Sequence, residues 1–353
     1  MARIDTYLAQ ALKQKASDLH FISGDPVRAR VHGNLKIVQE EILTTDTAEA
    51  AIFEIMDGIT KKAFDADDAA DFAYEIPDVS RFRVNAFRHL NGIGAIFRAI
   101  PSSAMTLQEL NMPSIIHDLC KHTQGMILVT GKTGSGKSTT LAAMIDAMNR
   151  RLKGHILTIE DPIEFVHKAR GCLISQREVG VHSPSFAEAL HSAMREDPDV
   201  ILVGEMRDLE TIGIAVTAAE MGILVMGTLH TNGAAQTVDR IINSFPADKQ
   251  SHIRTMISTS LRGVVSQQLL PTCDEPGRAA ALEIMINTSA VSNLIRQGKL
   301  DQLETAIQSG GNVGMKTMDN ALMDLVESGR VSAEEAYQQA NNKAKFEPLR
   351  NAE

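Results

Sequence analysis

Residues 131–138 read Gly-Lys-Thr-Gly-Ser-Gly-Lys-Ser, which fits the phosphate-binding pattern G-x-x-x-x-G-K-[ST]. A short apolar run at 126–130 precedes the segment, and a helix is expected to begin near Lys137. Glycines let successive backbone N–H groups surround the phosphates, and the lysine adds a full positive charge. A glycine-rich turn with an incidental lysine is the alternative, which both flanking elements argue against. The predicted nucleotide-binding residues are Gly131, Thr133, Gly134, Ser135, Gly136, Lys137, Ser138 and Thr139.

ATP and Mg²⁺ are the cofactors that this loop implies. The Ser138 hydroxyl would bind Mg²⁺, and Thr139 would contact the α-phosphate. In related sites a strand ends in an acidic residue that holds the metal through water. Here the run 200–204 ends in Gly204, so the metal contact must come from elsewhere and Glu205 remains as the candidate general base.

Three carboxylates that follow another apolar run, 155–159, could supply that contact. Glu160, Asp161 and Glu164 would lie at the carboxyl edge of a parallel sheet, which is the ligand side. We predict that Glu160 and Asp161 hold the metal, partly through water, and that Glu160 and Glu164 assist catalysis. The alternative is that these residues form a solvent-exposed acidic loop without a catalytic role.

His230 follows the apolar run 224–229, next to the predicted site. An imidazole there could hydrogen-bond the γ-phosphate and respond to its loss. By itself, a histidine at a strand end is more often a structural residue, hydrogen-bonded within the fold, than a catalytic one.

The runs that precede these residues alternate with helical stretches, which is typical of an α/β fold with helices on both faces of a parallel sheet. The pattern from 248 to 270, and again from 289 onward, predicts helix, with a strand at 281–286. Before residue 98, period-2 alternation at 27–31 and 81–87, an opening amphipathic helix and a helix at 44–59 predict a small α+β unit. We therefore predict a domain at 1–98, a linker at 99–112 and an ATPase domain at 113–353.

Composition narrows the function further. The 353 residues carry 35 Lys and Arg against 44 Asp and Glu, a net charge of −9, and there is no Trp. A nucleic-acid motor would need basic patches and stacking aromatic residues, so nucleic acid is not an expected partner. The most apolar stretch, 212–229, contains Glu220 and three glycines, which predicts no membrane span. The amino terminus lacks a signal peptide pattern, so a cytoplasmic protein is expected.

Five ordered motifs resemble one family: GKTGSGKSTT, TIEDPIEFVH, ISQREVG, DPDVILVGEMRDLET and GTLHTN. They are similar to the secretion ATPases of the type II secretion and type IV pilus superfamily. Within it, the segments ASDLH (16–20), RFRVNAF (81–87), NLIRQGK (293–299) and GMKTMDNAL (314–322) most resemble the pilus retraction ATPases of twitching motility. The resemblance makes 131–138 the Walker A loop, 160–164 the Asp box, Glu205 the Walker B catalytic glutamate and His230 the His box.

The resemblance also implies an architecture. It predicts a RecA-like P-loop core behind a PAS-like domain, assembled as a homohexamer at the inner membrane. The ring would act on a pilus platform protein, with a paralogous retraction ATPase as a second partner. Arg81 and Arg83 would reach nucleotide held by a neighbouring subunit. The alternative is that both arginines lie on a solvent-exposed strand face and contact no nucleotide. Arg195 and Arg207 are weaker candidates for such contacts, or ion pairs with Asp199 or Asp208.

Four departures from the family pattern bear on these expectations. Lys132 replaces a proline in the phosphate loop, and Ile223 stands where relatives often carry histidine. Ser292 and Gln297 replace Arg and Glu near the carboxyl terminus, which puts coupling rather than catalysis in question. Two alternatives stay open: a pilus-assembly or secretion ATPase, and an accessory nucleotide-binding ring subunit.

Overall fold

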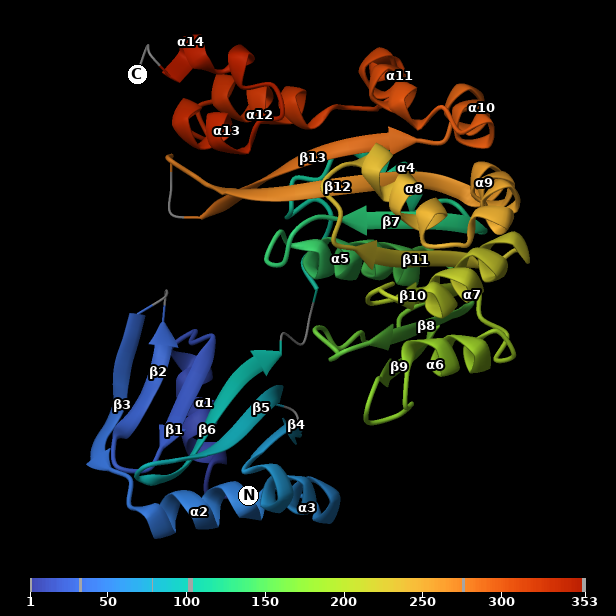
Figure 1. Ribbon diagram of the computed structural model, residues 1–353. Helices are drawn as coiled ribbons and strands as arrows, with labels where there is room; N and C mark the ends of the chain where they lie inside the picture. The colour runs from blue at the N-terminus through green and yellow to red at the C-terminus, as the bar shows by residue number, and fades with distance from the viewer. Residues whose placement is uncertain (1, 32–33, 78, 101–103, 275–276, 351–353) are drawn as a thin grey trace. The chain divides into compact units, whose positions relative to one another are not determined.

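The computed structural model describes residues 2–31, 34–77, 79–100, 104–274 and 277–350. It divides the chain into two compact units, Met1–Ser103 and Ala104–Glu353 (Figure 1). Pro101, Ser102 and Ser103, in the predicted linker, lie outside the described residues. Residues 104–112, also assigned to the linker, pack within the second unit because Leu107 is buried in its core.

The N-terminal unit is an α+β domain built on a six-stranded antiparallel sheet of order β3-β2-β1-β6-β5-β4. Apolar side chains of the three helices and the strands form one core. The elements are α1 (Asp5–Lys13), β1 (Asp18–Ile22), β2 (Pro26–Val31), β3 (Asn34–Ile42), α2 (Thr45–Glu54), α3 (Gly58–Asp67), β4 (Ala69–Ile76), β5 (Ser80–His89) and β6 (Gly92–Ile100).

The helix predicted at 44–59 is two helices. Thr44 caps α2 as expected, but α2 ends at Glu54 and Asp57 then begins α3. The Asp57 carboxylate accepts from the backbone N–H groups of Ile59 and Thr60. It therefore caps a second helix, whose first N–H groups have no partner within the helix. A local cap therefore overrides the continuous helical pattern.

The second unit is an α/β domain with a seven-stranded sheet of order β13-β12-β7-β11-β10-β8-β9. Every neighbouring pair is parallel except β12 with β13. The strands are β7 (Gly125–Thr130), β8 (His155–Glu160), β9 (Leu173–Glu178), β10 (Val200–Val203), β11 (Leu224–Leu229), β12 (Leu261–Pro271) and β13 (Arg278–Ile286).

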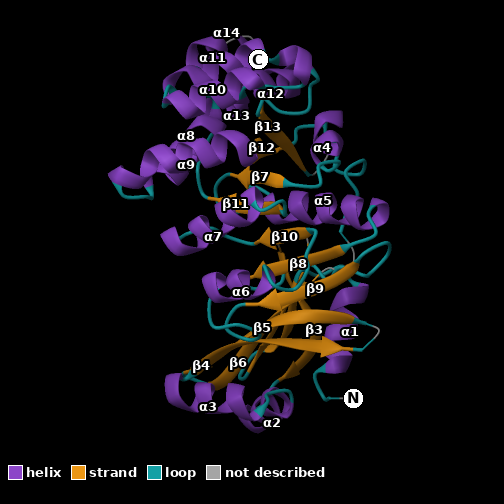
Figure 2. Ribbon diagram, turned by 90° about the vertical axis from the view of Figure 1, so that its right-hand side faces the viewer, coloured by secondary structure: helices purple, strands orange, loops and turns teal. Residues whose placement is uncertain are grey.

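Helices cover both faces of this sheet, which confirms the predicted fold class (Figure 2). On one face lie α4 (Ser114–Leu119) and α5 (Lys137–Arg151). On the other lie α6 (Phe186–Ala193), α7 (Leu209–Glu220), α8 (Ala234–Asn243), α9 (Ala247–Ser260), α10 (Ser289–Gln297) and α11 (Leu303–Ser309).

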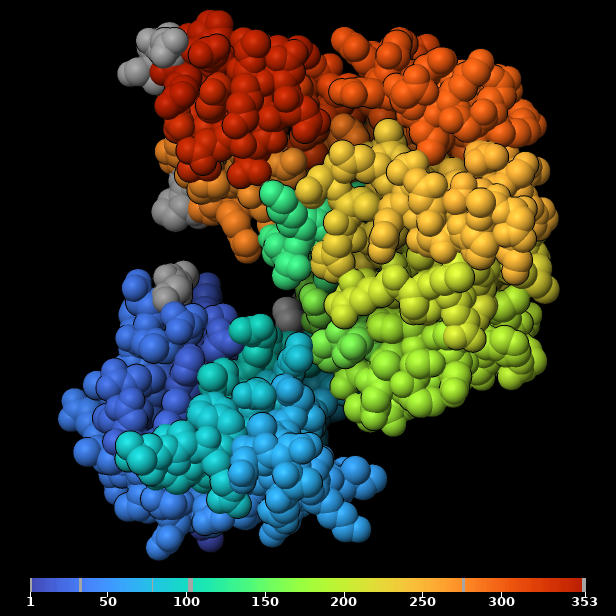
Figure 3. All heavy atoms as spheres, in the orientation of Figure 1, coloured from blue at the N-terminus to red at the C-terminus, as the bar shows by residue number. Residues whose placement is uncertain are grey.

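The chain after β13 forms a helical region, coloured orange to red, that makes a continuous surface at one end of the unit (Figure 3). Beyond α10 and α11 it contains α12 (Met318–Glu327), α13 (Ala333–Gln339) and α14 (Glu347–Arg350). The first two of these helices pack on Leu270, Ala279 and Ala281 of β12 and β13. Short 3₁₀ turns lie at Leu300–Gln302, Gly311–Val313 and Lys343–Lys345.

One prediction is wrong: residues 248–270 are not a single helix. The helix α9 ends at Ser260, and 261–271 form β12, paired with β7 on one side and β13 on the other. Gly263 is unfavourable in a helix, and Val264 and Val265 favour strands. Pairing with β7 and β13 provides hydrogen-bond partners for the backbone of this buried segment, so β12 is an interior strand of the sheet.

Candidate functional site

The phosphate-binding pattern forms the turn between β7 and α5, as the sequence predicts. Gly131, Gly134 and Gly136 all have positive φ, at 140°, 80° and 88°. A Cβ on Gly131 would lie 2.3 Å from the carbonyl oxygen of Gln267, and one on Gly136 would lie 2.7 Å from Gln267 Nε2. Glycine is therefore required at both positions, because the loop rests directly on β12.

Gln267 is a buried support of this loop that the sequence analysis missed. Thr140, in the first turn of α5, donates its hydroxyl to Gln267 Oε1 at 2.7 Å. The sequence pattern predicts a helix over 248–270, which gives Gln267 no such role. The β-branched pair that precedes it is the signal that could have placed it on a strand.

Two side chains of the loop could donate hydrogen bonds to a bound anion. Lys137 Nζ donates to the carbonyl oxygens of Gly131 at 2.8 Å and Lys132 at 3.1 Å. Ser135 Oγ is buried and has no hydrogen-bond partner within the described part of the chain. Burial lowers the pKa of Lys137, while the carboxylates of Glu205 and Glu164 oppose that shift. A triphosphate would give Lys137 a counter-charge and Ser135 an acceptor, so the residues present fit ATP.

Glu205 and His230 meet at the carboxyl edge of the sheet. His230 Nε2 lies 2.9 Å from Glu205 Oε1, and Arg207 Nε contacts the same oxygen. Burial raises the pKa of Glu205, but the hydrogen bond from Arg207 and the charges of His230, Arg207 and Lys137 outweigh it, so the pKa lies below its usual range. Glu205 is therefore an anion in reach of the phosphate loop, as a general base must be.

Thr228 of β11 fixes the backbone on both sides of Glu205. Its hydroxyl donates to the Gly204 carbonyl at 2.5 Å, and its own carbonyl accepts from Met206 N–H at 3.0 Å. This threonine belongs to the motif GTLHTN, but the sequence analysis gave a role only to His230. Gly204 itself lies against β8, because a Cβ there would be 3.1 Å from the Ile159 carbonyl oxygen and 3.2 Å from Glu160 Cα. Glu160 thus lies beside the position where related sites carry an aspartate.

The three carboxylates of the acidic cluster differ in exposure. Glu160 is buried, and it accepts from Thr158 Oγ1 at 2.6 Å, Gln176 Nε2 at 3.3 Å and Glu164 N–H at 3.4 Å. Burial raises the pKa of Glu160 despite these bonds. Asp161 and Glu164 are exposed. The exposed pair can reach the water shell of a metal, whereas Glu160 is held by protein groups.

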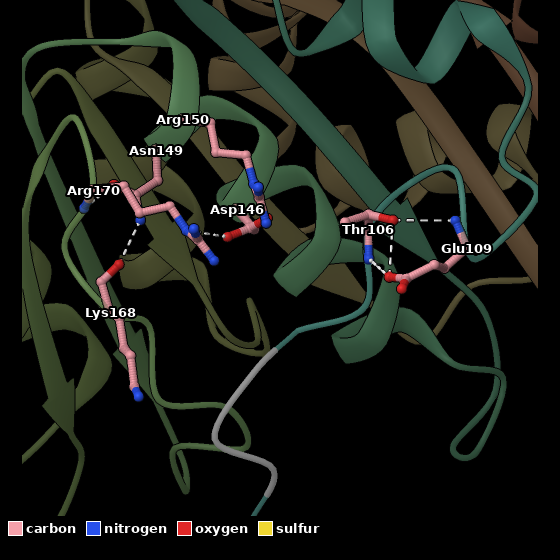
Figure 4. Close-up of polar contacts among 7 residues, drawn as sticks. All are labelled: Thr106, Glu109, Asp146, Asn149, Arg150, Lys168 and Arg170. Atoms are coloured by element: carbon pink, nitrogen blue, oxygen red, sulfur yellow. Dashed lines mark hydrogen bonds and ion pairs between the residues drawn. The ribbon is translucent and has the colours of Figure 1, made fainter.

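The chain after the acidic cluster is anchored on α5 (Figure 4). Asn149 Nδ2 donates to the Lys168 carbonyl at 2.8 Å, and Asn149 Oδ1 accepts from Arg170 N–H at 3.1 Å. Asp146 receives both Arg150 and Arg170, at 2.7 and 3.1 Å. The helix that begins at the phosphate loop therefore also holds the far end of the acidic segment.

The metal donors predicted from the sequence, Ser138, Glu160 and Asp161, stay a prediction. Within the described ranges, no three His, Cys, Asp or Glu side chains gather closely enough to hold an ion. Mg²⁺ keeps several waters and is bound largely by substrate phosphates, so the Ser138 hydroxyl and the exposed carboxylates fit an ion that enters with the nucleotide.

The remaining arginine candidates occupy other positions. Arg81 and Arg83 lie on β5 of the N-terminal unit, and Arg83 Nε is 3.9 Å from Asp71 Oδ1. Their role at a neighbour's nucleotide stays a prediction. The suggested ion pairs with Asp199 and Asp208 are wrong. Arg207 pairs with Glu205, and Arg195 Nη1 contacts His191 Nδ1 at 2.9 Å. Those two aspartates bind the backbone of His155 and Thr211 instead.

Comparison with known proteins identifies the family. The model of the Type II/IV secretion system protein family matches residues 1–345. The chain belongs to this family. It is 50% identical to the type IV pilus retraction ATPase PilT of Pseudomonas aeruginosa over 96% of this chain and 98% of that protein. It is 51% identical to a twitching motility protein of Neisseria gonorrhoeae, over 89% and 84% of the two chains.

A solved structure extends the likeness to three dimensions. The crystal structure of the pilus retraction motor PilT with bound ADP superposes with a TM-score of 0.91 at 38% identity, over 99% of this chain and 100% of that one. The resemblance predicted from five motifs is therefore confirmed over nearly the whole sequence.

Proposed function

We propose that this chain is an ATP hydrolase that powers the retraction of type IV pili. The observation that carries the proposal is the meeting of Glu205 with His230 at 2.9 Å, at the sheet edge where the phosphate loop begins. The names of the relatives, a retraction ATPase and a twitching motility protein, support retraction rather than assembly.

In the proposed reaction, Lys137, Ser135 and the N-terminus of α5 bind the phosphates of ATP. Glu205 accepts a proton from the attacking water, and Thr228 holds Glu205 in place. His230, whose Nε2 lies 2.9 Å from Glu205 Oε1, lies where it can orient that carboxylate or contact the γ-phosphate. Bound Mg²⁺ would supply charge neutralisation at the transferred phosphoryl group, with Ser138, Asp161, Glu160 and Glu164 as its neighbours.

The proposed assembly is a homohexamer, with Arg81 and Arg83 completing the site of the adjacent subunit. Its partners are an inner-membrane pilus platform protein and a paralogous retraction ATPase. The ring would act from the cytoplasm at the pilus base. In the described residues, no helix is both long and apolar enough to span a bilayer.

The test is the rate of ATP hydrolysis by purified Glu205→Gln. We expect unchanged ATP binding and a rate at least ~100-fold lower, since general-base catalysis is worth about 10²–10⁴. Glu210→Gln, which makes the same change at an exposed site five residues away, is the matched control and should hydrolyse ATP normally. Retained turnover in Glu205→Gln would assign the base to the acidic cluster instead.

A further inference from the structure

Glu283 of β13 is a buried carboxylate outside the site described above. Only 7% of its surface is exposed. Its Oε1 accepts from Ala234 N–H at 2.7 Å, and its Oε2 accepts from Met318 N–H at 3.2 Å. These are the first residues of α8 and α12. One side chain therefore caps two helices that are far apart in the sequence.

The first of these helices begins just after the candidate catalytic histidine. Three residues, 231–233, separate His230 from Ala234. Gly233 is the N-cap of α8 and provides no side-chain cap. Neighbouring strands supply the missing acceptors: Ser266 Oγ accepts from Gly233 N–H at 2.9 Å, and Glu283 takes the next N–H. Ser266 and Glu283 are directly paired across β12 and β13, so the two acceptors are in register.

The same short segment is tied to the phosphate loop. Thr237 Oγ1 lies 2.7 Å from Thr231 Oγ1 and 3.4 Å from Thr130 Oγ1, and Thr130 directly precedes Gly131. The chain after His230 is therefore held by the strand that enters the nucleotide site and by the pair Ser266 and Glu283. Of the residues that hold this segment, Glu283 also contacts the C-terminal helical region, through Met318 N–H.

The second helix is fixed to the same strand. Ile284, next to Glu283, exchanges backbone hydrogen bonds with Lys316 at 2.8 and 3.0 Å. This bridge sets the register that brings Met318 N–H to Glu283. Asp319, the next residue, then accepts from the backbone N–H groups of Asn341 and Asn342. The start of α12 thereby connects β13 to the segment that follows α13.

A carboxylate is a costly residue for this place. Burial raises the pKa of Glu283, the two backbone donors oppose that shift, and the nearby carboxylates of Glu304 and Asp319 add to it. The cost of burying a carboxylate is best offset where both of its oxygens accept hydrogen bonds at once. An amide could accept at only one oxygen and would present an N–H group to the other helix.

We propose that Glu283 is a positioning residue that ties the His230 segment to α12, so that movement at the nucleotide site and movement of the C-terminal helices depend on each other. The proposal rests on the proposed function only through the role of His230. The tie between α8 and α12 stands independently of it.

The first measurement is a double-mutant cycle on ATP turnover. We expect Glu283→Gln to lower kcat by about tenfold, the worth of one hydrogen bond to a charged group, and to change KM for ATP less than twofold. In a His230→Ala background the same change should alter kcat less than twofold. Asp319→Asn is the matched control, because it changes a buried capping carboxylate that does not contact α8, and it should leave kcat within twofold of wild type.

An equal loss of kcat from Glu283→Gln in both backgrounds would overturn the proposal, because the residue would then act on the fold rather than through His230. If His230→Ala alone leaves kcat unchanged, the proposed role of His230 fails, and the second measurement decides the tie.

The second measurement is amide hydrogen exchange in the full-length protein. Glu283→Gln should speed exchange at both 234–238 and 318–322, whereas Asp319→Asn should affect only the C-terminal region. Faster exchange at one helix start alone would overturn the tie. Should Glu283→Gln not fold, Glu283→Asp replaces it in both measurements, because it keeps the charge and shortens the reach by one methylene.

Discussion

Lys137 donates to two carbonyl oxygens of its own loop, those of Gly131 and Lys132. We propose that this ammonium group binds the β- and γ-phosphates of ATP. We predict that Lys137→Ala abolishes tight ATP binding, measured by titration with a fluorescent ATP analogue. Lys132→Ala, which removes an exposed charge from the same loop, should bind normally. Near-normal affinity in Lys137→Ala would contradict the phosphate-loop assignment.

Arg207 sets the proton affinity of Glu205. Burial raises the pKa of Glu205, and the Arg207 hydrogen bond and charge are among the interactions that lower it below its usual value. Removing the guanidinium should therefore raise that pKa, so that the base becomes protonated at a higher pH. We predict that in Arg207→Ala the acidic limb of the pH profile of kcat/KM moves to higher pH.

The control for this shift is Arg195→Ala, which removes an exposed arginine whose contact is His191. Its acidic limb should coincide with that of wild type. A limb that stays in place in Arg207→Ala would mean that a group other than Glu205 titrates in that limb.

At the scale of elements, the fit of the phosphate loop on β12 is as important as its sequence. Gly131 and Gly134 both have positive φ, but a Cβ on Gly131 would collide with the Gln267 carbonyl, whereas one on Gly134 meets no atom within 4 Å. We predict that Gly131→Ala lowers the melting temperature and weakens ATP binding clearly more than Gly134→Ala does. The difference should exceed about 1 kcal/mol in unfolding free energy, since backbone cannot move aside as a side chain can. Equal effects would show that the contact with β12 is unimportant.

The sequence predicted the four strands that lead into the candidate catalytic residues, and it missed β9, which carries the motif ISQREVG, and β12, which supports the phosphate loop. The four strands that lead into Gly131, the acidic cluster, Glu205 and His230 are built on apolar runs, so their positions followed directly from the pattern. By contrast, β12 follows a helix without a turn signal, and its supporting role depends on pairing with β7, which lies about 135 residues earlier in the chain. Glu283 lies outside the predicted motifs, and Thr228 lies within GTLHTN but was given no role, since only the folded backbone brings their partners to them.

Two of the family departures are also explained at this scale. Ser292 of α10 donates its hydroxyl to the Ser258 carbonyl of α9 at 2.7 Å, so it has a packing role in place of an arginine. Gln297 donates to Asn293 Oδ1 within α10. Both substitutions lie in the helical region and neither touches the residues of the candidate catalytic site.

At the scale of the whole molecule, the proposal requires more than one chain. Arg81 and Arg83 belong to the N-terminal unit, and we propose that they act on a neighbour's nucleotide. A mixture of Lys137→Ala protein with an Arg81→Ala/Arg83→Ala double mutant should therefore recover part of the ATPase activity. Some boundaries in mixed rings would combine an intact phosphate loop with intact arginines.

Subunit exchange must be established first, by co-purifying the two variants with different tags. Mixed rings that hydrolyse ATP no faster than either variant alone would exclude the action in trans. The two arginines would then return to the solvated-strand interpretation.

The central claim is that ATP hydrolysis at Glu205 powers retraction, and the most direct measurement is the number of surface pili in cells whose only copy carries Glu205→Gln. The account predicts more surface pili than in wild type, none of which retract, because assembly continues while its reversal has lost its energy source. Cells without pili would contradict it and would assign the chain to assembly.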